Sequence, residues 1–494
     1  MREQILVIGN GMVGHHFVAT LINSGSRAGI TVVGEEPRIA YDRVHMSELF
    51  AGSDPEDLAL SSAEEYAAWG VDLILGDRAV TVDRKRRRVI TESRRELPFD
   101  TLVLATGSYP FVPPVPGHDQ AGCMSYRTID DLEKIRATAA RSSTGVVVGG
   151  GLLGLECANA LKNLGLETHV VEFAPGLMGV QLDDGASSML RGKIEDLGVR
   201  VHTRRNTQRI VPGETAGLRL EFSDGEQLAT DMVVFSAGIR PRDDLARDCG
   251  LELGARGGIV IDEQCRSSDP GIYAIGECAL YKGRIFGLMA PGYRMAEVVA
   301  GELAGVAGRF TGADMSTKLK LLGVDVGGIG DAHGRSEGSV ALLYADRKAK
   351  TYKRLVTSAD GRRLLGAALV GDCSDYDTLL QYYLNDIELP EDPASLIVPG
   401  GDGGLSLEEL PPSATVCGCH NVSKAQIVAA LESGNESLAA VRKATCASTG
   451  CGGCTALVQQ LIDSHGAGAT PVEAEVTPLK RSATVFAEPS RRSA

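Results

Sequence analysis

A glycine-rich motif that occurs twice constrains the fold of this chain more than any other feature. Residues 5–14 read ILVIGNGMVG and residues 146–156 read VVVGGGLLGLE, so each copy places G-x-G-x-x-G between a strand pattern and a helix pattern. In such a unit the first glycine makes a tight turn, the second lets the backbone approach a pyrophosphate, and the third lets the helix pack closely. The free N–H groups at the helix start bind phosphate. Two dinucleotide sites are therefore predicted, at Gly9, Gly11 and Gly14 and at Gly149, Gly151 and Gly154.

An acidic residue follows each motif at the distance expected of a ribose-binding group. Glu35 ends the run ITVVGE, 21 residues after Gly14, and Glu172 ends the run THVVE, 18 residues after Gly154. A carboxylate here binds the ribose hydroxyls and repels a 2′-phosphate. Residues 173–184 contain no Lys or Arg that could receive such a phosphate. The second site is therefore predicted to prefer NADH over NADPH.

The composition limits the class of partner. The chain has 494 residues, of which 43% are hydrophobic and 23% charged, which is typical of a globular protein with several domains. Its net charge of −14 argues against a general nucleic-acid or anionic-membrane partner. We see no apolar run of ~18 residues and no signal-peptide pattern, so no membrane span and a cytoplasmic location are expected. The basic run at residues 84–88 is interpreted as the solvated tip of a hairpin.

Changes of pattern along the chain predict its division into domains. Residues 313–394 show strand-like runs and a helix pattern at 377–385 without a catalytic constellation, so we interpret them as a packing or dimerisation domain. Residues 466–494 lack an apolar period and are expected to be disordered. The expected division is a first dinucleotide-binding domain from residues 1–112 and 241–312, a second from 113–240, the α+β domain 313–394, a linker 395–414, a cysteine module 415–465 and the tail 466–494.

The cysteines of the module have the spacing of a metal site. Cys417-x-Cys419 and Cys451-x-x-Cys454 are separated by 31 residues, and four thiolates in two pairs suit a [2Fe–2S] cluster or a tetrahedral zinc. Glycines beside the second pair leave backbone N–H groups free to bond sulfur, which favours the cluster over zinc. Disulfides are the weakest alternative in a chain without an export signal.

Two further residues of the module could be mistaken for ligands. Cys446 is interpreted as a bystander, and His420 is a weaker candidate that could replace one cysteine. The module is expected to contain two amphipathic helices, at residues 424–431 and 456–464.

Taken together, six motifs resemble those of the two-dinucleotide flavoprotein reductases. They are GNGMVG, EEPRIAYDRVHMS, LATGSYPFVPPVPG, GGGLLGLE, AGIRP and IYAIGECA. The resemblance is greatest to the flavin-containing half of the assimilatory NAD(P)H nitrite reductase large subunit and to the homologous assimilatory nitrate reductase electron-transfer subunit. Residues 415–465 resemble bacterioferritin-associated ferredoxin. The likeness covers roughly residues 3–465 and implies an α/β fold with two Rossmann-like, glutathione-reductase-like domains, a small α+β domain and a helical [2Fe–2S] module.

The resemblance also implies a role for each motif residue. FAD would be bound by Gly9, Gly11, Gly14, Glu35, Arg43, Thr106 and Glu277. NAD(P)H would be bound by Gly149, Gly151, Gly154, Glu156, Glu172 and Gly238, with Glu156 near the nicotinamide. The cluster would be ligated by Cys417, Cys419, Cys451 and Cys454. No side chain is expected to act as a nucleophile or acid–base catalyst.

The function implied is electron transfer from NAD(P)H through FAD and a [2Fe–2S] cluster to a nitrate or nitrite reductase partner. Related reductases often carry Lys after the Ser of YDRxxxS, whereas Glu48 follows Ser47 here. No cysteine follows Cys454, so we expect no sirohaem half in this chain and interpret it as a separate subunit or part of a large subunit. A homodimer is an open expectation.

Two alternatives from other classes stay open. The first is an NADH oxidase or dehydrogenase that uses another small acceptor or a ferredoxin-type protein, with structural cysteines. The second is a metal-responsive binding protein.

Overall fold

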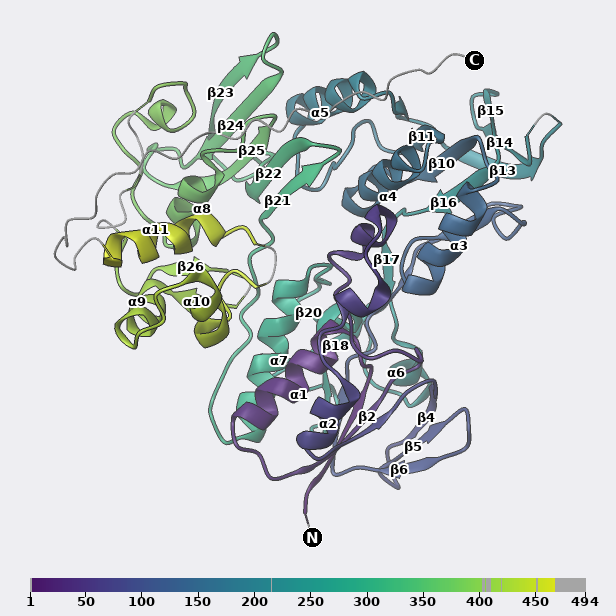
Figure 1. Cartoon of the computed structure of the whole chain (residues 1–494), viewed down its shortest axis with the longest axis vertical. Helices are drawn as coiled ribbons and strands as arrows, with labels where there is room; N and C mark the ends of the chain where they lie inside the picture. The colour runs from purple at the N-terminus through teal and green to yellow at the C-terminus, as the bar shows by residue number, and fades with distance from the viewer. Residues whose placement is uncertain are drawn as a thin grey trace, which may run out of the picture.

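The computed structural model describes residues 2–214, 216–401, 405, 410–418, 420–449 and 452–466. In Figure 1 the lower lobe contains the first glycine motif, the upper right lobe contains the second, and the small domain lies at the upper left above the C-terminal module. None of the described helices is long and apolar enough to cross a membrane.

The lower lobe is built on a parallel sheet with the strand order β19-β7-β1-β2-β3. Its strands are β1 (Gln4–Ile8), β2 (Gly29–Val33), β3 (Val71–Ile74), β7 (Thr101–Leu104) and β19 (Ile272–Ala274). Four consecutive residues of β1 are buried because both faces of a parallel sheet are covered. The helices of this lobe are α1 (Met12–Asn23), α2 (Ala63–Ala68), α6 (Asp244–Asp248) and α7 (Met289–Leu303).

The upper right lobe repeats this plan with the strand order β12-β11-β10-β16-β9. The strands are β9 (Cys123–Ser125), β10 (Thr144–Val148), β11 (Glu167–Val171), β12 (Arg200–His202) and β16 (Met232–Phe235), and all pairs are parallel. The helices are α3 (Ile129–Ala139), α4 (Leu152–Asn163) and α5 (Asp184–Asp196). Both strand–turn–helix units predicted from the glycine motifs are therefore present.

Short antiparallel elements complete the two lobes. Each lobe carries a three-stranded meander, formed by β4 (Ala79–Asp83), β5 (Arg88–Thr91) and β6 (Glu96–Pro98) or by β13 (Thr207–Pro212), β14 (Leu218–Phe222) and β15 (Gln227–Thr230). The two chain crossings between the lobes pair with each other as β8 (Ser108–Pro110) and β17 (Ile239–Pro241). The lower lobe also contains the pair β18 (Ile259–Ile261) and β20 (Ala279–Tyr281) and the short 3-10 helices η1 (Met46–Ala51), η2 (Pro55–Leu58) and η3 (Gly276–Cys278).

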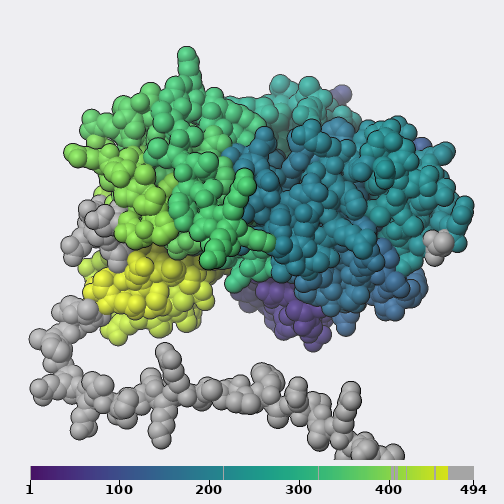
Figure 2. Space-filling model, turned by 90° about the horizontal axis from the view of Figure 1, so that it is seen from above, coloured from purple at the N-terminus to yellow at the C-terminus, as the bar shows by residue number. Residues whose placement is uncertain are grey.

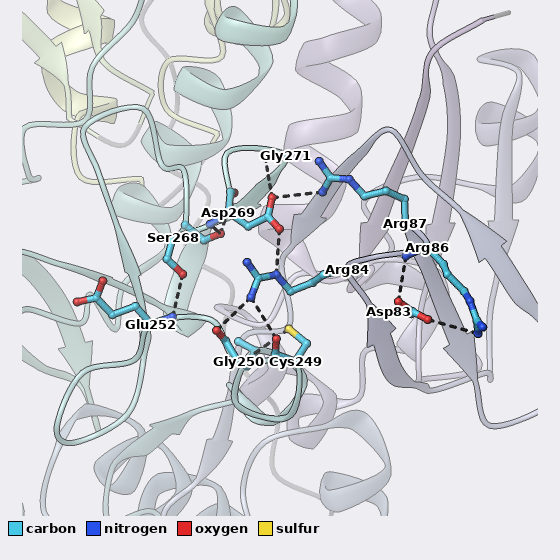
Figure 3. Close-up of polar contacts among 12 residues, drawn as sticks. Asp83, Arg84, Arg86, Arg87, Cys249, Gly250, Glu252, Ser268, Asp269 and Gly271 are labelled. Atoms are coloured by element: carbon cyan, nitrogen blue, oxygen red, sulfur yellow. Dashed lines mark hydrogen bonds and ion pairs between the residues drawn. The ribbon is translucent and has the colours of Figure 1, made fainter.

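The basic run lies in the β4–β5 hairpin, as predicted, but only part of it is solvated. Arg86 is exposed, whereas Arg84 Nε lies 2.9 Å and Arg87 Nη1 3.3 Å from the carboxylate of Asp269 (Figure 3). Arg84 also donates to the carbonyl of Cys249 over 3.2 Å. The run therefore ties the hairpin to a distant segment of the same lobe.

The small domain is an antiparallel sheet covered by one helix. Its strand order is β21-β22-β25-β24-β23, followed by α8 (Tyr376–Leu384) and the 3-10 helix η4 (Pro393–Leu396). The strands are β21 (Thr317–Leu321), β22 (Val324–Gly330), β23 (Val340–Asp346), β24 (Thr351–Thr357) and β25 (Leu364–Val370). The expected strands and helix are confirmed, and the expected linker is described only in part.

The C-terminal module contains one helix more than predicted. A hairpin of β26 (Thr415–Cys417) and β27 (Val422–Ser423) precedes α9 (Lys424–Glu432), α10 (Leu438–Thr445) and α11 (Thr455–Gly466). Helix α10 was not predicted because it spans only eight residues and buries a single side chain, that of Val441, although Ser437 caps it by accepting from the N–H of Ala440. The expected disordered tail lies, from residue 467 on, outside the described residues.

The module packs against the small domain, as Figures 1 and 2 show. The Thr415 N–H donates to Asn385 Oδ1, just after α8, over 2.8 Å. Ile387 packs against the apolar cores of both units. The small domain thus acts as a packing platform for the module.

Candidate functional site

In the first glycine motif, each of the three positions requires glycine for a different structural reason. Gly9 has φ +113°, and a Cβ added to it would lie 2.1 Å from the Ala105 carbonyl oxygen. A Cβ on Gly14 would lie 2.1 Å from the carbonyl oxygen of Gly9, which is the close approach of helix to strand. A Cβ on Gly11 would meet no atom within 4 Å. The open position is the one that must admit a pyrophosphate.

The second motif repeats the same pattern on β10 and α4. Gly149 has φ +124°, and a Cβ there would lie 2.2 Å from the carbonyl oxygen of Ser236. A Cβ on Gly154 would lie 2.0 Å from the Gly149 carbonyl oxygen, whereas one on Gly151 would meet nothing within 4 Å. Both sites therefore fit a dinucleotide by the same test.

The helix starts leave phosphate-binding groups available. Gly11 is the N-cap of α1 and Gly151 the N-cap of α4, and neither helix start has a side-chain capping hydrogen bond. The N–H groups of the first turn and the positive end of the helix dipole therefore face the position of a pyrophosphate.

The two acids predicted to bind ribose, Glu35 and Glu172, lie just after β2 and β11, the second strand of each unit. Glu172 accepts hydrogen bonds from the N–H groups of Gly150 (2.5 Å) and Ala174 (2.7 Å), which hold its carboxylate against the glycine turn. Glu35 forms an ion pair with Arg242. Arg242 also covers the ring of Tyr109, with its Cζ 4.2 Å from the ring centroid.

A cavity of about 650 Å³ joins the first glycine motif to the second lobe, the small domain and the C-terminal module. Its wall includes Asn10, whose Oδ1 accepts from the Tyr66 hydroxyl over 2.8 Å. Asn10 Nδ2 is buried and finds no hydrogen-bond partner among the described residues, so a donor is available to a ligand. Of the residues expected at a site, those in the wall are Gly9, Gly11, Glu35, Arg43, Thr106, Glu156, Glu277, Cys417 and Cys454.

The remaining expected residues do not line this cavity. Gly14 packs inside the first unit. The second glycine turn is formed by Gly149, Gly151 and Gly154, with Glu172 beside it, and Gly238 (φ +103°) follows β16. The second lobe reaches the cavity through Leu152, Leu153 and Glu156 at the start of α4.

A polar network crosses the cavity wall at the residues expected along FAD. Arg43 Nη1 donates to the Arg127 carbonyl (3.0 Å), and Arg127 Nη2 donates to Glu277 Oε2 (2.5 Å). The hydroxyl of Ser108 donates to the same oxygen of Glu277 over 2.7 Å. The Thr106 hydroxyl donates to a backbone carbonyl over 2.6 Å. Arg127 comes from the second lobe, so sequence reasoning, which had no local signal for it, missed this bridge.

Glu156 is a half-buried carboxyl at the junction of the two lobes. Burial raises the pKa of Glu156 to about 7, and the nearby His45 opposes that rise. His45 itself bonds Asp42 through Nδ1 over 2.7 Å. A carboxyl that titrates near neutral pH beside a cofactor site is a group able to change charge during turnover.

A lysine of the small domain, rather than the residue after Ser47, lies in the cavity wall. Glu48 is exposed on η1 and does not line the cavity. Lys318 of β21 does, with its Nζ 2.9 Å from Asp377 and 5.4 Å from the ring centroid of Tyr376. The small domain therefore supplies a cation to the wall, which no local motif indicated.

Two of the four expected cluster ligands are described, and both face the cavity. Cys417 ends β26 and is buried, and Cys454 precedes α11. Cys419 and Cys451 lie outside the described residues. Cys446 is exposed at the end of α10 and does not line the cavity, and His420 Nε2 lies 3.0 Å from the Thr449 hydroxyl.

Comparison with family models assigns three regions of the chain. Residues 3–302 match the pyridine nucleotide-disulphide oxidoreductase model, 316–385 the rubredoxin NAD+ reductase C-terminal domain, and 415–464 the BFD-like [2Fe-2S] binding domain. These matches confirm the predicted fold class and the cofactors FAD, NAD(P)H and [2Fe–2S].

Known relatives extend this comparison. The chain is 54% identical to the nitrite reductase [NAD(P)H] large subunit of Klebsiella oxytoca over 94% of its own length and 49% of that protein. It is 33% identical to the assimilatory nitrate reductase electron transfer subunit of Bacillus subtilis, over 94% and 60% of the two chains. The chain thus spans about half the length of the first of these relatives.

A solved structure shows the same arrangement of elements. A ferredoxin reductase from Rhodopseudomonas palustris superposes with a TM-score of 0.73 and 26% identity, over 81% of this chain and 98% of that one. The chain therefore belongs to the pyridine nucleotide-disulphide oxidoreductase family, as an FAD-dependent NAD(P)H oxidoreductase that also carries a [2Fe–2S] domain.

Proposed function

We propose that the chain carries electrons from NAD(P)H through FAD and its [2Fe–2S] cluster to an assimilatory nitrite or nitrate reductase catalytic part. The observation that carries the proposal is the shared cavity, whose wall contains Gly9 and Gly11 of the first motif together with Cys417 and Cys454 of the module. A flavin bound on the first motif would have the cluster ligands as neighbours across one cavity. The acceptor is taken from what the relatives' names say they reduce.

In this proposal each expected domain binds one cofactor or supports the module that does. Residues 1–112 and 241–312 bind FAD, 113–240 bind NAD(P)H, 313–394 support the module, and 415–465 hold the cluster on Cys417, Cys419, Cys451 and Cys454. The residues proposed for FAD are Gly9, Gly11, Gly14, Glu35, Arg43, Thr106 and Glu277. Those proposed for NAD(P)H are Gly149, Gly151, Gly154, Glu156, Glu172 and Gly238.

The protein contributes position and electrostatics, and the bound cofactors supply the redox chemistry. FAD accepts two electrons as a hydride and can release them singly. Each NADH would give up one hydride and leave as NAD⁺, and the proton of that hydride would be released once its two electrons have passed to the acceptor. The glycine turns bring the backbone to the pyrophosphates, and the Arg127–Glu277 pair fixes the second lobe to the first at the cavity.

The sequence also disfavours the dithiol mechanism suggested by the family's description. Before residue 400 the cysteines stand singly, so no C-x(2–4)-C pair is available beside the flavin site. Electrons must therefore leave by another route. The cysteine module provides one such route. We also propose a cytoplasmic location, because a cluster held by cysteine thiolates and a nicotinamide substrate are both typical of that compartment.

Substitution of a cluster ligand tests the route. In Cys417→Ser, flavin reduction by NADH in stopped flow should stay within about twofold of wild type, since the glycine turns are untouched. Steady-state turnover with the reductase partner should fall at least about a hundredfold, because the one-electron relay is lost. Direct reduction of an artificial dye by the flavin should survive.

Cys446→Ser is the matched control, because it removes an exposed thiol of the same module that does not line the cavity. It should keep both rates and the visible cluster spectrum. Intact partner turnover in a cluster-free Cys417→Ser protein would contradict the proposal. That result would favour an oxidase or dehydrogenase that reduces its acceptor directly from the flavin.

A further inference from the structure

Two helices of the lower lobe carry a pair of stacked rings outside the cavity. The rings of His16 on α1 and Tyr293 on α7 lie face to face, with centroids 4.0 Å apart and planes 7° apart. The two helices run side by side in Figure 1, and both begin at the cavity wall, α1 at Met12 and α7 at Met289. The stack is therefore fixed to the elements that would hold FAD.

A third ring comes from the cysteine module. The ring centroid of His420 lies 6.0 Å from that of His16 and 5.6 Å from that of Tyr293, in tilted contact with both. His420 follows Cys417 by three residues, and its Nε2 also lies 3.0 Å from the Thr449 hydroxyl. The module thus contacts the lower lobe through His420, close in sequence to Cys417.

The surroundings of the stack restrict its movement. Tyr293 is only 7% exposed, and His16 Nε2 lies 3.5 Å from Glu297 Oε1. The other oxygen of Glu297 is 3.0 Å from Arg294 Nη1, one turn earlier on α7. Elsewhere the module is attached to the small domain, through Asn385 and Thr415. The ring cluster is therefore a second point of attachment, to a different lobe.

We propose that His16 and Tyr293 are positioning residues that hold the His420 loop against the FAD-binding lobe and thereby set the separation of flavin and cluster. The inference rests on the proposed function, since it assigns residues to the flavin-to-cluster step. Stacked and tilted aromatic pairs contribute specific geometry beyond the area they bury. Attachment at two points leaves the Cys417 loop less freedom than the small-domain contact alone.

Paired substitutions in the full-length, cofactor-loaded protein test the inference. Tyr293→Leu and His16→Leu remove a ring, whereas Tyr293→Phe and His16→Phe keep one. In the Leu variants, flavin reduction by NADH should stay within about twofold of wild type, but the following cluster reduction should slow by about tenfold. Amide hydrogen exchange should rise in peptides from residues 12–23 and 420–432. The Phe variants should restore both readouts.

Trp69→Leu is the matched control. The Trp69 ring stacks on His15, the neighbour of His16 on α1, at a centroid distance of 5.9 Å. It makes no contact with the rings of His16, Tyr293 and His420. This variant should keep the wild-type rate of cluster reduction and the wild-type exchange in residues 420–432.

The possible results distinguish the positioning role of His16 and Tyr293 from the proposed electron-transfer function. If NADH reduces the wild-type cluster, but the Leu variants match wild type in both transfer rate and exchange, the positioning role is wrong. A cluster that NADH fails to reduce in the wild type removes the proposed function and the inference together. Slower transfer with raised exchange in both Leu variants, and rescue in both Phe variants, supports the inference.

Discussion

Glu156, which we propose lies near the nicotinamide, is a carboxyl that can change its charge near neutral pH. Its pKa is raised to about 7 by burial, so the carboxyl is neutral below that pH and negatively charged above it. The dihydronicotinamide ring gains positive charge as it gives up hydride. A carboxylate nearby would stabilise that charge, whereas the neutral acid would not.

Flavin reduction by NADH should therefore accelerate as the pH rises through about 7. We expect a change of about fivefold, or ~1 kcal/mol, between the two limits. Glu156→Gln should flatten the profile near its low-pH limit, as stopped-flow measurements between pH 6 and 8 would show. An unchanged pH profile in Glu156→Gln would exclude this carboxyl as the titrating group.

Single residues also show what sequence reasoning can and cannot find. The three glycine roles were predictable because each follows from local backbone geometry, and φ and the close contacts at Gly9 and Gly149 agree. Arg127 and Lys318 were not predictable, since each reaches the cavity from a different lobe or domain. Their sequence neighbourhoods contain no motif, and only the tertiary fold brings them to the site.

Among the elements, the adjacent strands β11 and β12 bring together residues that are about 30 positions apart in the sequence. Glu172 follows β11, and the loop after β12 donates to this segment. The Arg204 N–H bonds the Ala174 carbonyl and the Arg205 N–H bonds the Glu172 carbonyl, both over 3.0 Å. Arg205 pairs with Asp224, whereas Arg204 is exposed. A search of residues 173–184 for a cation could not find Arg204 and Arg205, because they follow the next strand, β12.

Glu172→Ala should narrow the preference for NADH over NADPH roughly ten- to hundredfold in kcat/KM, since bonds to the ribose hydroxyls and repulsion of a 2′-phosphate are both lost. Adding Arg204→Ala to that variant should lower NADPH use again, because the neighbouring cation is removed. Steady-state kinetics with both nucleotides checks the pair. A wild-type protein that uses NADPH as well as NADH would show that Glu172 does not select the nucleotide.

Element prediction failed where the signal was short. The parallel strands, the small-domain strands and α8 were predicted because their apolar runs are long or regular. Helix α10 spans eight residues and rests on Val441, so its periodicity was too brief to detect. The basic hairpin was found, but the Asp269 contact that anchors it joins residues more than 180 positions apart, beyond any local pattern.

At the scale of the whole molecule, one cavity relates all four parts of the chain. The two lobes, the small domain and the module each contribute residues to its wall. Sequence analysis predicted the parts and their order, but not that Cys417 and Cys454 would face the same space as the first glycine motif. That placement depends on the packing of α8 against the module and on the His420 contact with the lower lobe.

In the proposed route, electrons reach the cluster only through the flavin. Gly11→Val tests it, because a Cβ added at Gly11 meets no atom within 4 Å, so the valine is expected to displace the pyrophosphate rather than protein atoms. The measurement is an anaerobic NADH titration of this flavin-free protein, followed by the electron paramagnetic resonance signal of the reduced cluster. We predict no cluster signal with NADH and a full signal with dithionite, whereas wild type gives the signal with both. A cluster that NADH reduces in the absence of flavin would show that electrons do not need the flavin to reach the cluster.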